Sequence, residues 1–280
     1  MDARLAVLMH LQSALRAYGS ELLLPHGQAA PRAPAADPVA APEPEPAPAT
    51  APVHNPRPAA RPTPAAPAAP ATARAPAAVP SEAASTCAAR LAELRGEVLS
   101  CAKCRLHEER RQAVFGEGNP GAEVLFVGEA PGAVEDQTGR PFVGPAGQLL
   151  DRILNAAMGL RREDVYIANV NKCRPPGNRD PQPDEVAACL PYLTEQIRAI
   201  RPRVVVALGR VAAHNLLGRT DSLRQLRGQE LAFEGIPVVV TYHPAALLRD
   251  PSLKADTWED VKRVNRLLGR PERPAPVQQG

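Results

Sequence analysis

Four of the five cysteines in this chain are spaced as the ligands of a metal centre would be. Cys101 and Cys104 form a C-x2-C pair, and Cys173 and Cys189 follow further along the chain. Four thiolates can bind a tetrahedral zinc ion or an iron-sulfur cluster, and spacing does not choose between the two. Four unrelated buried thiols are the alternative. Cys87 lies outside the pattern, and we predict that it is a free thiol.

Three further residues with distinctive chemistry stand at or near the ends of short apolar runs or in a loop. Phe142 lies in the segment G-R-P-F-V-G, Asn169 is near the end of one apolar run, and His243 directly follows another. A loop aromatic can stack on a planar ligand, and an asparagine amide can read the edge of a base. Each residue also has a purely structural interpretation, as part of the core or of a loop that packs on it.

The elements that must position these residues alternate between strands and helices. Near-continuous apolar runs are typical of strands buried on both faces, and they occupy residues 124–127, 166–170, 204–208 and 238–242. Apolar residues at helical spacing predict helices at residues 149–157, 186–200, 88–100 and 254–268. We therefore predict an α/β fold, a three-layer α/β/α sandwich around a central, mostly parallel four-stranded sheet. Ligands bind beyond the carboxyl ends of such strands.

Proline divides the chain into regions. Of its 33 prolines, 16 fall between Pro31 and Pro80, in a stretch otherwise made mostly of alanine. Such a composition buries too little apolar surface to fold. We predict an amphipathic helix over 1–25, a disordered Pro/Ala-rich linker over 26–84, a folded domain over 85–270 and a disordered tail over 271–280. The N-terminal helix would dock on the domain or bind a protein partner.

Charge and hydropathy limit the classes of protein to consider. The formal net charge is +3, which neither demands nor excludes nucleic acid. Residues 198–229 hold seven arginines and one acid, so this segment is either a basic face or a solvated surface. With no membrane span and no secretory signal in the sequence, we expect a cytoplasmic monomer that does not bind membranes.

Taken together, these motifs resemble the family 4 uracil-DNA glycosylases, the iron-sulfur class of the uracil-DNA glycosylase superfamily. The resemblance covers residues 101–268. It rests on the cysteine spacing and on motifs in the family's order: G-E-A-P-G with E-D three residues on, G-R-P-F-V-G, N-V-N-K-C-R-P-P-G-N-R and H-P-A-A-L-L-R. The family excises uracil from DNA and leaves an abasic site for base-excision repair.

The resemblance implies a cofactor and a set of pocket residues. Its four cysteines hold a structural [4Fe-4S] cluster. In the pocket, Phe142 would stack on uracil and Asn169 would form hydrogen bonds with its O4/N3 edge. His243 would form a hydrogen bond with uracil O2, and the backbone at Ala130 would contribute a donor nearby. The partner would be uracil-containing DNA, single- or double-stranded.

Other roles implied by the resemblance lie around the pocket. Glu129 would stabilise the cationic sugar or orient water, and Glu135 would help exclude the thymine methyl group. Asn178 would contribute by ordering its loop. The contacts to the duplex, a wedge and a phosphate anchor, would come from Leu247, Leu248 and Arg249.

Two alternatives bear on this interpretation. A related branch attaches covalently to the abasic sugar through a histidine in a basic loop, and it carries glutamine where this chain has Ala130. Residues 216–229 hold arginines but no histidine, so we expect turnover. A non-catalytic metal-containing module that binds DNA or a polymerase is the competing class of function, but it leaves the placement of Phe142, Asn169 and His243 unexplained.

Overall fold

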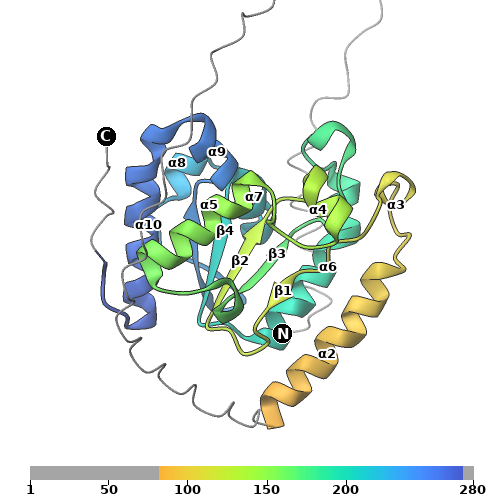
Figure 1. Cartoon of the computed structure of the whole chain (residues 1–280), viewed down its shortest axis with the longest axis horizontal. Helices are drawn as coiled ribbons and strands as arrows, with labels where there is room; N and C mark the ends of the chain where they lie inside the picture. Colours follow the sequence, from red (N-terminus) through yellow and green to blue (C-terminus); the bar gives the residue numbers. More distant parts are fainter. Residues whose placement is uncertain (1–81, 274–280) are drawn as a thin grey trace, which may run out of the picture. The chain divides into compact units, whose positions relative to one another are not determined.

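A mixed sheet of six strands is the centre of the computed structural model, which describes residues 82–273 (Figure 1). The strand order is β1-β3-β2-β4-β6-β5. The strands are β1 (Glu117–Gly118), β2 (Val124–Gly128), β3 (Tyr166–Asn169), β4 (Val204–Leu208), β5 (Leu231–Phe233) and β6 (Ile236–Thr241).

The four central strands are the ones that the apolar runs predict. Strands β3, β2, β4 and β6 pair in parallel, and every residue of β2, β3 and β4 is buried. Parallel pairing brings the last residues of the strands to one edge of the sheet, and Gly128 lies directly opposite Asn169 there. The loops that follow these strands therefore meet at the same edge.

The prediction of a four-stranded sheet was wrong in number, because two short strands extend it. Strand β1 pairs with β3 and strand β5 with β6, both antiparallel. Strands of two and three residues are too short for a periodic pattern to reveal. The turn that joins β5 to β6 has positive φ at both Glu234 and Gly235, as a two-residue hairpin turn requires.

Helices flank the sheet. The α-helices are α2 (Glu82–Leu99), α3 (Leu106–Glu109), α4 (Ala133–Thr138), α5 (Pro145–Ile153), α6 (Pro183–Ile200), α7 (Arg210–Leu217), α8 (Leu223–Leu226), α9 (Pro244–Arg249) and α10 (Lys254–Leu268). Shorter helical turns are η1 (Leu154–Met158), η2 (Arg162–Asp164), η3 (Pro176–Asn178) and η4 (Pro251–Leu253).

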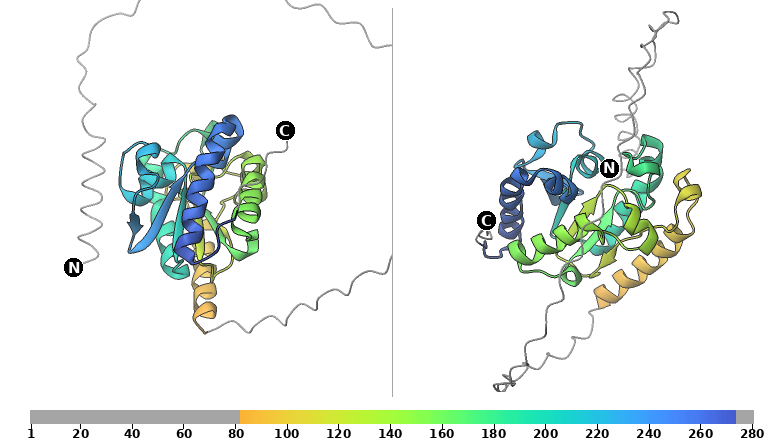
Figure 2. Two further views of the ribbon diagram at one scale, coloured as in Figure 1. Left: turned by 90° about the vertical axis from the view of Figure 1, so that its left-hand side faces the viewer. Right: turned by 45° about the horizontal axis from the view of Figure 1, so that its top comes forward.

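Successive side chains of the strands point to opposite faces of the sheet and pack into two separate hydrophobic cores, one on each face. This arrangement confirms the three-layer sandwich. Leu125 and Val127 of β2 pack in one core with apolar residues of α2, α6 and α7. Val124 and Phe126 of the same strand pack in the other, with residues of α5, η1 and α10. Figure 2 shows α10, in dark blue, lying along the sheet.

The N-terminal regions are described only in part. The predicted helix over 1–25 lies outside the described residues, as do residues 26–81 of the predicted linker (26–84) and residues 274–280 of the predicted C-terminal tail (271–280). Helix α2 begins at Glu82, so the last three residues of the predicted linker are helical. Alanine and glutamate favour helix once the prolines end. Within the described residues, no helix is long and apolar enough to cross a membrane.

Candidate functional site

Asn169 ends strand β3 at the carboxyl edge of the sheet, next to the last residue of β2. Its side chain is 2% exposed, and its Oδ1 atom has no hydrogen-bond partner among the described residues. A Cβ added to Gly128 would lie 2.4 Å from that oxygen and 2.5 Å from Cζ of Phe142. The absence of a side chain at Gly128 therefore lets the amide and the aromatic ring approach the same point.

Phe142 brings a buried ring to this edge from the loop between α4 and α5. Its backbone has φ of 51°, which is uncommon for a residue other than glycine. Its ring centroid lies 5.5 Å from that of His243, with 34° between the planes. The structure therefore brings together Asn169, Phe142 and His243, as the sequence predicts.

His243 is held in one tautomer by the helix that follows it. It is the N-cap of α9, and its Nδ1 atom accepts a hydrogen bond from the backbone N–H of Ala245 at 3.1 Å. The proton of the neutral ring is then on Nε2. Burial, with a smaller effect of Arg249, lowers the pKa of His243 to about 4. At neutral pH this ring is an uncharged donor.

Glu129 and Ala130 directly follow β2, in a half-buried bend. The Glu129 carbonyl accepts from the Asn171 N–H at 2.9 Å, which ties this loop to the one after β3. Burial, with a smaller contribution from Asp180 and against the opposing effect of Arg210, raises the pKa of the Glu129 carboxyl to about 7. Asp180 and Arg210 form an ion pair. Glu129 can therefore exchange a proton near neutral pH.

Glu135 lies in α4, and its observed contacts are with the Phe142 loop. Its Oε1 atom accepts hydrogen bonds from the N–H groups of Val143 at 2.9 Å and Gly144 at 2.8 Å. The carboxylate is buried. Glu135 thereby fixes the backbone next to the Phe142 ring.

The four predicted metal ligands line a single cavity. Cys101 and Cys104 come from the segment after α2, Cys173 from the loop after β3 and Cys189 from α6. Burial raises the pKa of three of these thiols, that of Cys189 to about 12. A thiol of this kind binds as thiolate only when a metal replaces its proton.

Basic and amide groups surround the sulfur atoms. Arg110 donates to the Cys173 Sγ atom at 3.0 Å, and the Lys172 N–H donates to the Cys189 Sγ atom at 3.1 Å. The Lys172 ammonium is 1% exposed and forms no ion pair with a carboxylate of the described residues. Its Nζ atom donates to the Asn169 carbonyl at 2.7 Å and to Gln196 Oε1 at 2.6 Å. This donor set suits an anionic, all-thiolate centre.

The remaining predicted site residues lie on η3 and α9, outside the group formed by Asn169, Phe142 and His243. Asn178 is exposed on η3, where its Oδ1 atom accepts a hydrogen bond from Arg174 at 2.7 Å, and within the described residues no hydrogen bond joins it to Asn169 or Phe142. Leu247 was predicted to contact the duplex, but it is buried at 1% exposure. This prediction was wrong, because Leu247 lies on the inner side of α9. Leu248, at 47%, and Arg249 are exposed.

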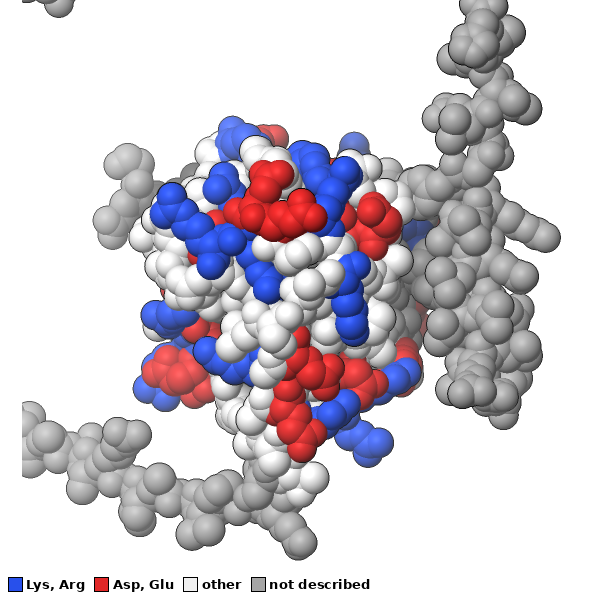
Figure 3. Space-filling model, turned by 90° about the vertical axis from the view of Figure 1, so that its right-hand side faces the viewer, with Lys and Arg blue, Asp and Glu red and all other residues white. Residues whose placement is uncertain are grey.

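The arginine-rich segment 198–229 is largely neutralised by acids. Five of its seven arginines form ion pairs, among them Arg198 with Glu195 and Glu234, and Arg203 with Glu123. The face that carries α2 and α3 likewise shows basic and acidic side chains side by side (Figure 3). The solvated-surface interpretation therefore fits this segment better than a basic face.

Comparisons with known proteins identify the family of this chain. The family model of the uracil DNA glycosylase superfamily matches residues 115–267. A type-4 uracil-DNA glycosylase of Sulfurisphaera tokodaii is 46% identical over 191 residues, which cover 65% of this chain and 87% of the relative. One of Archaeoglobus fulgidus is 47% identical over 188 residues, 64% of this chain and 94% of the relative. The chain belongs to the type-4 uracil-DNA glycosylases.

Similarity to the type-5 branch of the superfamily is lower. A type-5 uracil-DNA glycosylase of Pyrobaculum aerophilum is 36% identical over 164 residues, which cover 52% of this chain and 72% of the relative. The family resemblance stated from the sequence motifs is thus confirmed at the level of the type-4 class.

Sequence patterns missed some residues of this glycosylase's site. Gly128 was part of a motif, but its role as the meeting point of two side chains was not predicted. Lys172 belongs to the motif N-V-N-K-C-R-P-P-G-N-R, but no role was predicted for its side chain. A glycine at a strand end could have been suspected, whereas no local signal shows that a lysine side chain turns into the interior.

We predict that Gly128→Ala destabilises this type-4 glycosylase. The new methyl group would force Asn169 and Phe142 apart, and overpacking of this kind costs about 1–3 kcal/mol. Urea unfolding measures the change in the free energy of unfolding. Gly96→Ala is the matched control, because nothing lies within 4 Å of the added Cβ on α2. Equal stability of the two variants would contradict the close approach at Gly128.

Proposed function

We propose that the protein excises uracil from DNA by hydrolysing the N-glycosidic bond, releasing the base and leaving an abasic site. The observation that carries this proposal is the buried Oδ1 atom of Asn169, which has no partner among the described residues. Four buried side-chain oxygens of the described residues lack a partner, and Asn169 Oδ1 is the one of them that shares the space next to Gly128 with the Phe142 ring. An unpaired buried acceptor beside an aromatic ring favours a ligand with a matching donor. Membership of the type-4 class supports uracil as that ligand.

Base recognition would use the amide edge and the ring together. Asn169 Oδ1 would accept from uracil N3–H, its amide N–H would donate to O4, and Phe142 would stack on the base. Cytosine has no hydrogen on N3 and carries a donor in place of O4. Such a mismatch leaves buried groups unpaired, at a cost of about 1–3 kcal/mol for each one.

Cleavage of the glycosidic bond leaves negative charge on the uracil ring and positive charge on the sugar. His243 would donate from Nε2 to uracil O2, with the Ala130 N–H as a second donor to the departing anion. A neutral imidazole can do this without losing its proton. The hydrogen bond from Ala245 to Nδ1 supports this tautomer.

Two acidic residues would act at the edge of the pocket. Glu129, as the carboxylate, would stabilise the cationic sugar or orient the attacking water. Glu135 would help exclude the thymine methyl group through the loop that it holds.

DNA must present the base outside the helix, because a stacked base is out of reach. Leu248 would enter the duplex where the base leaves, and Arg249 would contact a phosphate. Both lie on α9, the helix that begins directly after His243. Asn178 would act only indirectly, through the order of its loop.

We further propose that Cys101, Cys104, Cys173 and Cys189 hold a [4Fe-4S] cluster. When bound, the cluster would supply covalent cross-links between the segment after α2, the β3 loop and α6. Among the described residues, no three or more His, Cys, Asp or Glu side chains are grouped closely enough for one metal ion. The support for the cluster is therefore the single cavity that all four cysteines line, together with membership of the type-4 class.

The function is tested by base release from oligonucleotides that contain uracil, thymine or hypoxanthine, followed by alkali. We expect strand scission at uracil. Asn169→Asp should narrow the preference for uracil over cytosine, because a carboxylate cannot donate to O4. A protein with no scission at uracil, beside an active control enzyme, would contradict the glycosylase function and favour a binding module.

The pH dependence tests Glu129. If the carboxylate is the active form, the single-turnover rate should rise with pH through about 7 and then level off, as Glu129 with its pKa of about 7 ionises. Glu129→Gln should remove this inflection. His243, with a pKa of about 4, should add none near neutrality. A wild-type rate that stays constant through neutral pH would exclude this role of Glu129.

The cluster is tested by colour and iron content. Protein purified without oxygen should be brown, and Cys101→Ser combined with Cys104→Ser should lose iron and melt at a lower temperature. Cys87→Ser is the matched control, since Cys87 does not line the cavity of the four cysteines and its thiol donates a hydrogen bond to the Pro120 carbonyl at 3.2 Å, and this variant should keep its iron. A colourless native protein loaded with zinc would overturn the assignment.

A further inference from the structure

The loop that carries Phe142 is held in a backbone conformation that its own sequence does not favour. Phe142 has φ of 51°, and bulky residues adopt the left-handed region only where the surroundings hold them there. Helix α5 also lies very close to this loop. A Cβ added to Gly147 would lie 1.8 Å from the Phe142 carbonyl oxygen. Some other group must therefore fix the loop.

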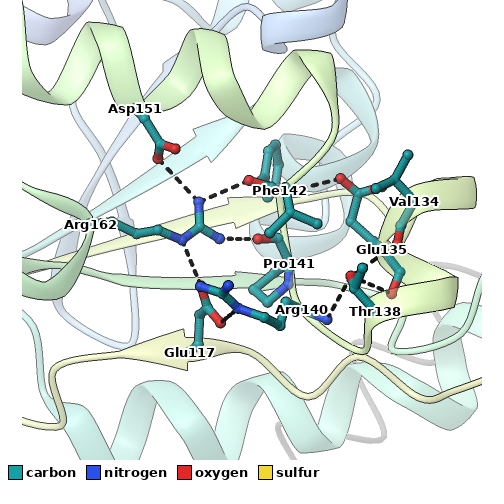
Figure 4. Close-up of polar contacts among 10 residues, drawn as sticks. Glu117, Val134, Glu135, Thr138, Arg140, Pro141, Phe142, Asp151 and Arg162 are labelled. Atoms are coloured by element: carbon teal, nitrogen blue, oxygen red, sulfur yellow. Dashed lines mark hydrogen bonds and ion pairs between the residues drawn. The ribbon is translucent and has the colours of Figure 1, made fainter.

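Arg162 supplies the contacts on the carbonyl side of the loop. Its guanidinium donates from Nη1 to the Phe142 carbonyl at 2.8 Å and from Nη2 to the Pro141 carbonyl (Figure 4). Two consecutive carbonyl groups are thus bound by one planar fork. Such a fork restricts the rotation of the peptide between them, which sets the direction of the Phe142 side chain.

Arg162 is itself fixed by two carboxylates. Its Nε atom donates to Glu117 at 2.6 Å, and its Nη1 atom lies 3.1 Å from Asp151 of α5. Glu117, on β1, also binds Arg140 of the same loop at 2.8 Å and 3.0 Å. The Arg162 side chain is only 16% exposed. These bonds hold its guanidinium in a single orientation between the sheet edge and α5.

On the amide side, the Glu135 carboxylate binds the next two residues of the loop, Val143 and Gly144. A cation therefore binds the Pro141 and Phe142 carbonyl groups, and an anion binds the N–H groups of the two residues that come next in the loop. Each charge matches the partial charge of the backbone groups that it meets. The Phe142 ring, between the two, points toward Gly128 and His243.

We propose that Arg162 is a positioning residue for uracil recognition, which holds Phe142 in the orientation that stacks on the base. Arg162 would not touch the substrate, so its effect would pass entirely through Phe142. The proposal rests on the proposed function. Lysine could not replace it, because a single ammonium does not reproduce the planar fork.

A double-mutant cycle tests the proposal. Single-turnover excision of uracil is measured for wild type, Arg162→Met, Phe142→Ala and the double variant. We expect Arg162→Met to slow excision by roughly 10- to 100-fold, the size typical of a misplaced group. In the Phe142→Ala background the same change should alter the rate by no more than about twofold. If the effects of the two substitutions on the excision rate multiply in the double variant, the proposal is overturned, because Arg162 then acts independently of Phe142.

Controls separate positioning from folding and from the proposed function. Arg161→Met is the matched variant, since Arg161 is an exposed neighbour with ion pairs to Glu163 and Asp164, and it should keep the wild-type rate. Arg162→Lys preserves the charge and should still slow excision, so a wild-type rate for it would also overturn the proposal. Melting temperatures show which variants fold. If Phe142→Ala itself excises uracil normally, the stacking role fails instead.

Discussion

Parallel pairing of four buried strands is the constraint on which the rest of this structure depends. Because β2, β3, β4 and β6 run in the same direction, the chain leaves each of them at the same edge. Asn169 therefore ends beside Gly128, and His243 follows β6 only two residues after its last residue. Residues far apart in the sequence thus meet at one edge of the sheet.

Buried charges fix the loops that this edge assembles. The Lys172 ammonium binds the Asn169 carbonyl, and its own backbone N–H binds the Cys189 sulfur. Lys172 thus connects the thiol cavity with Asn169 at the edge of the sheet. The Phe142 loop is likewise fixed by charged side chains: Arg162 donates to its carbonyl groups, and the Glu135 carboxylate accepts from its N–H groups. In a low-dielectric interior such bonds are strong, and leaving any member unpaired is costly.

The carboxyl edge of the sheet carries a neutral donor, His243, and an acid that titrates near neutrality, Glu129. Burial lowers the pKa of His243 and raises that of Glu129, and in each case the charged form is the one disfavoured. These opposite pKa shifts suit a reaction in which charge of opposite sign develops on the base and on the sugar. The environment of each residue, rather than its type, sets its protonation state.

The sequence by itself determined the four parallel strands, the main helices, the set of four cysteines and the family, because apolar periodicity and ordered motifs are local properties. It also indicated Phe142, Asn169 and His243, since all three belong to those motifs. It missed β1 and β5, which are too short to have a period, and it placed the buried Leu247 on the DNA. Only the tertiary structure decided that Gly128 lets two side chains meet, that Lys172 turns inward and that Arg162 binds the Phe142 loop. Those contacts join residues from different elements, and their energies depend on burial and direction, which no local pattern of residue types encodes.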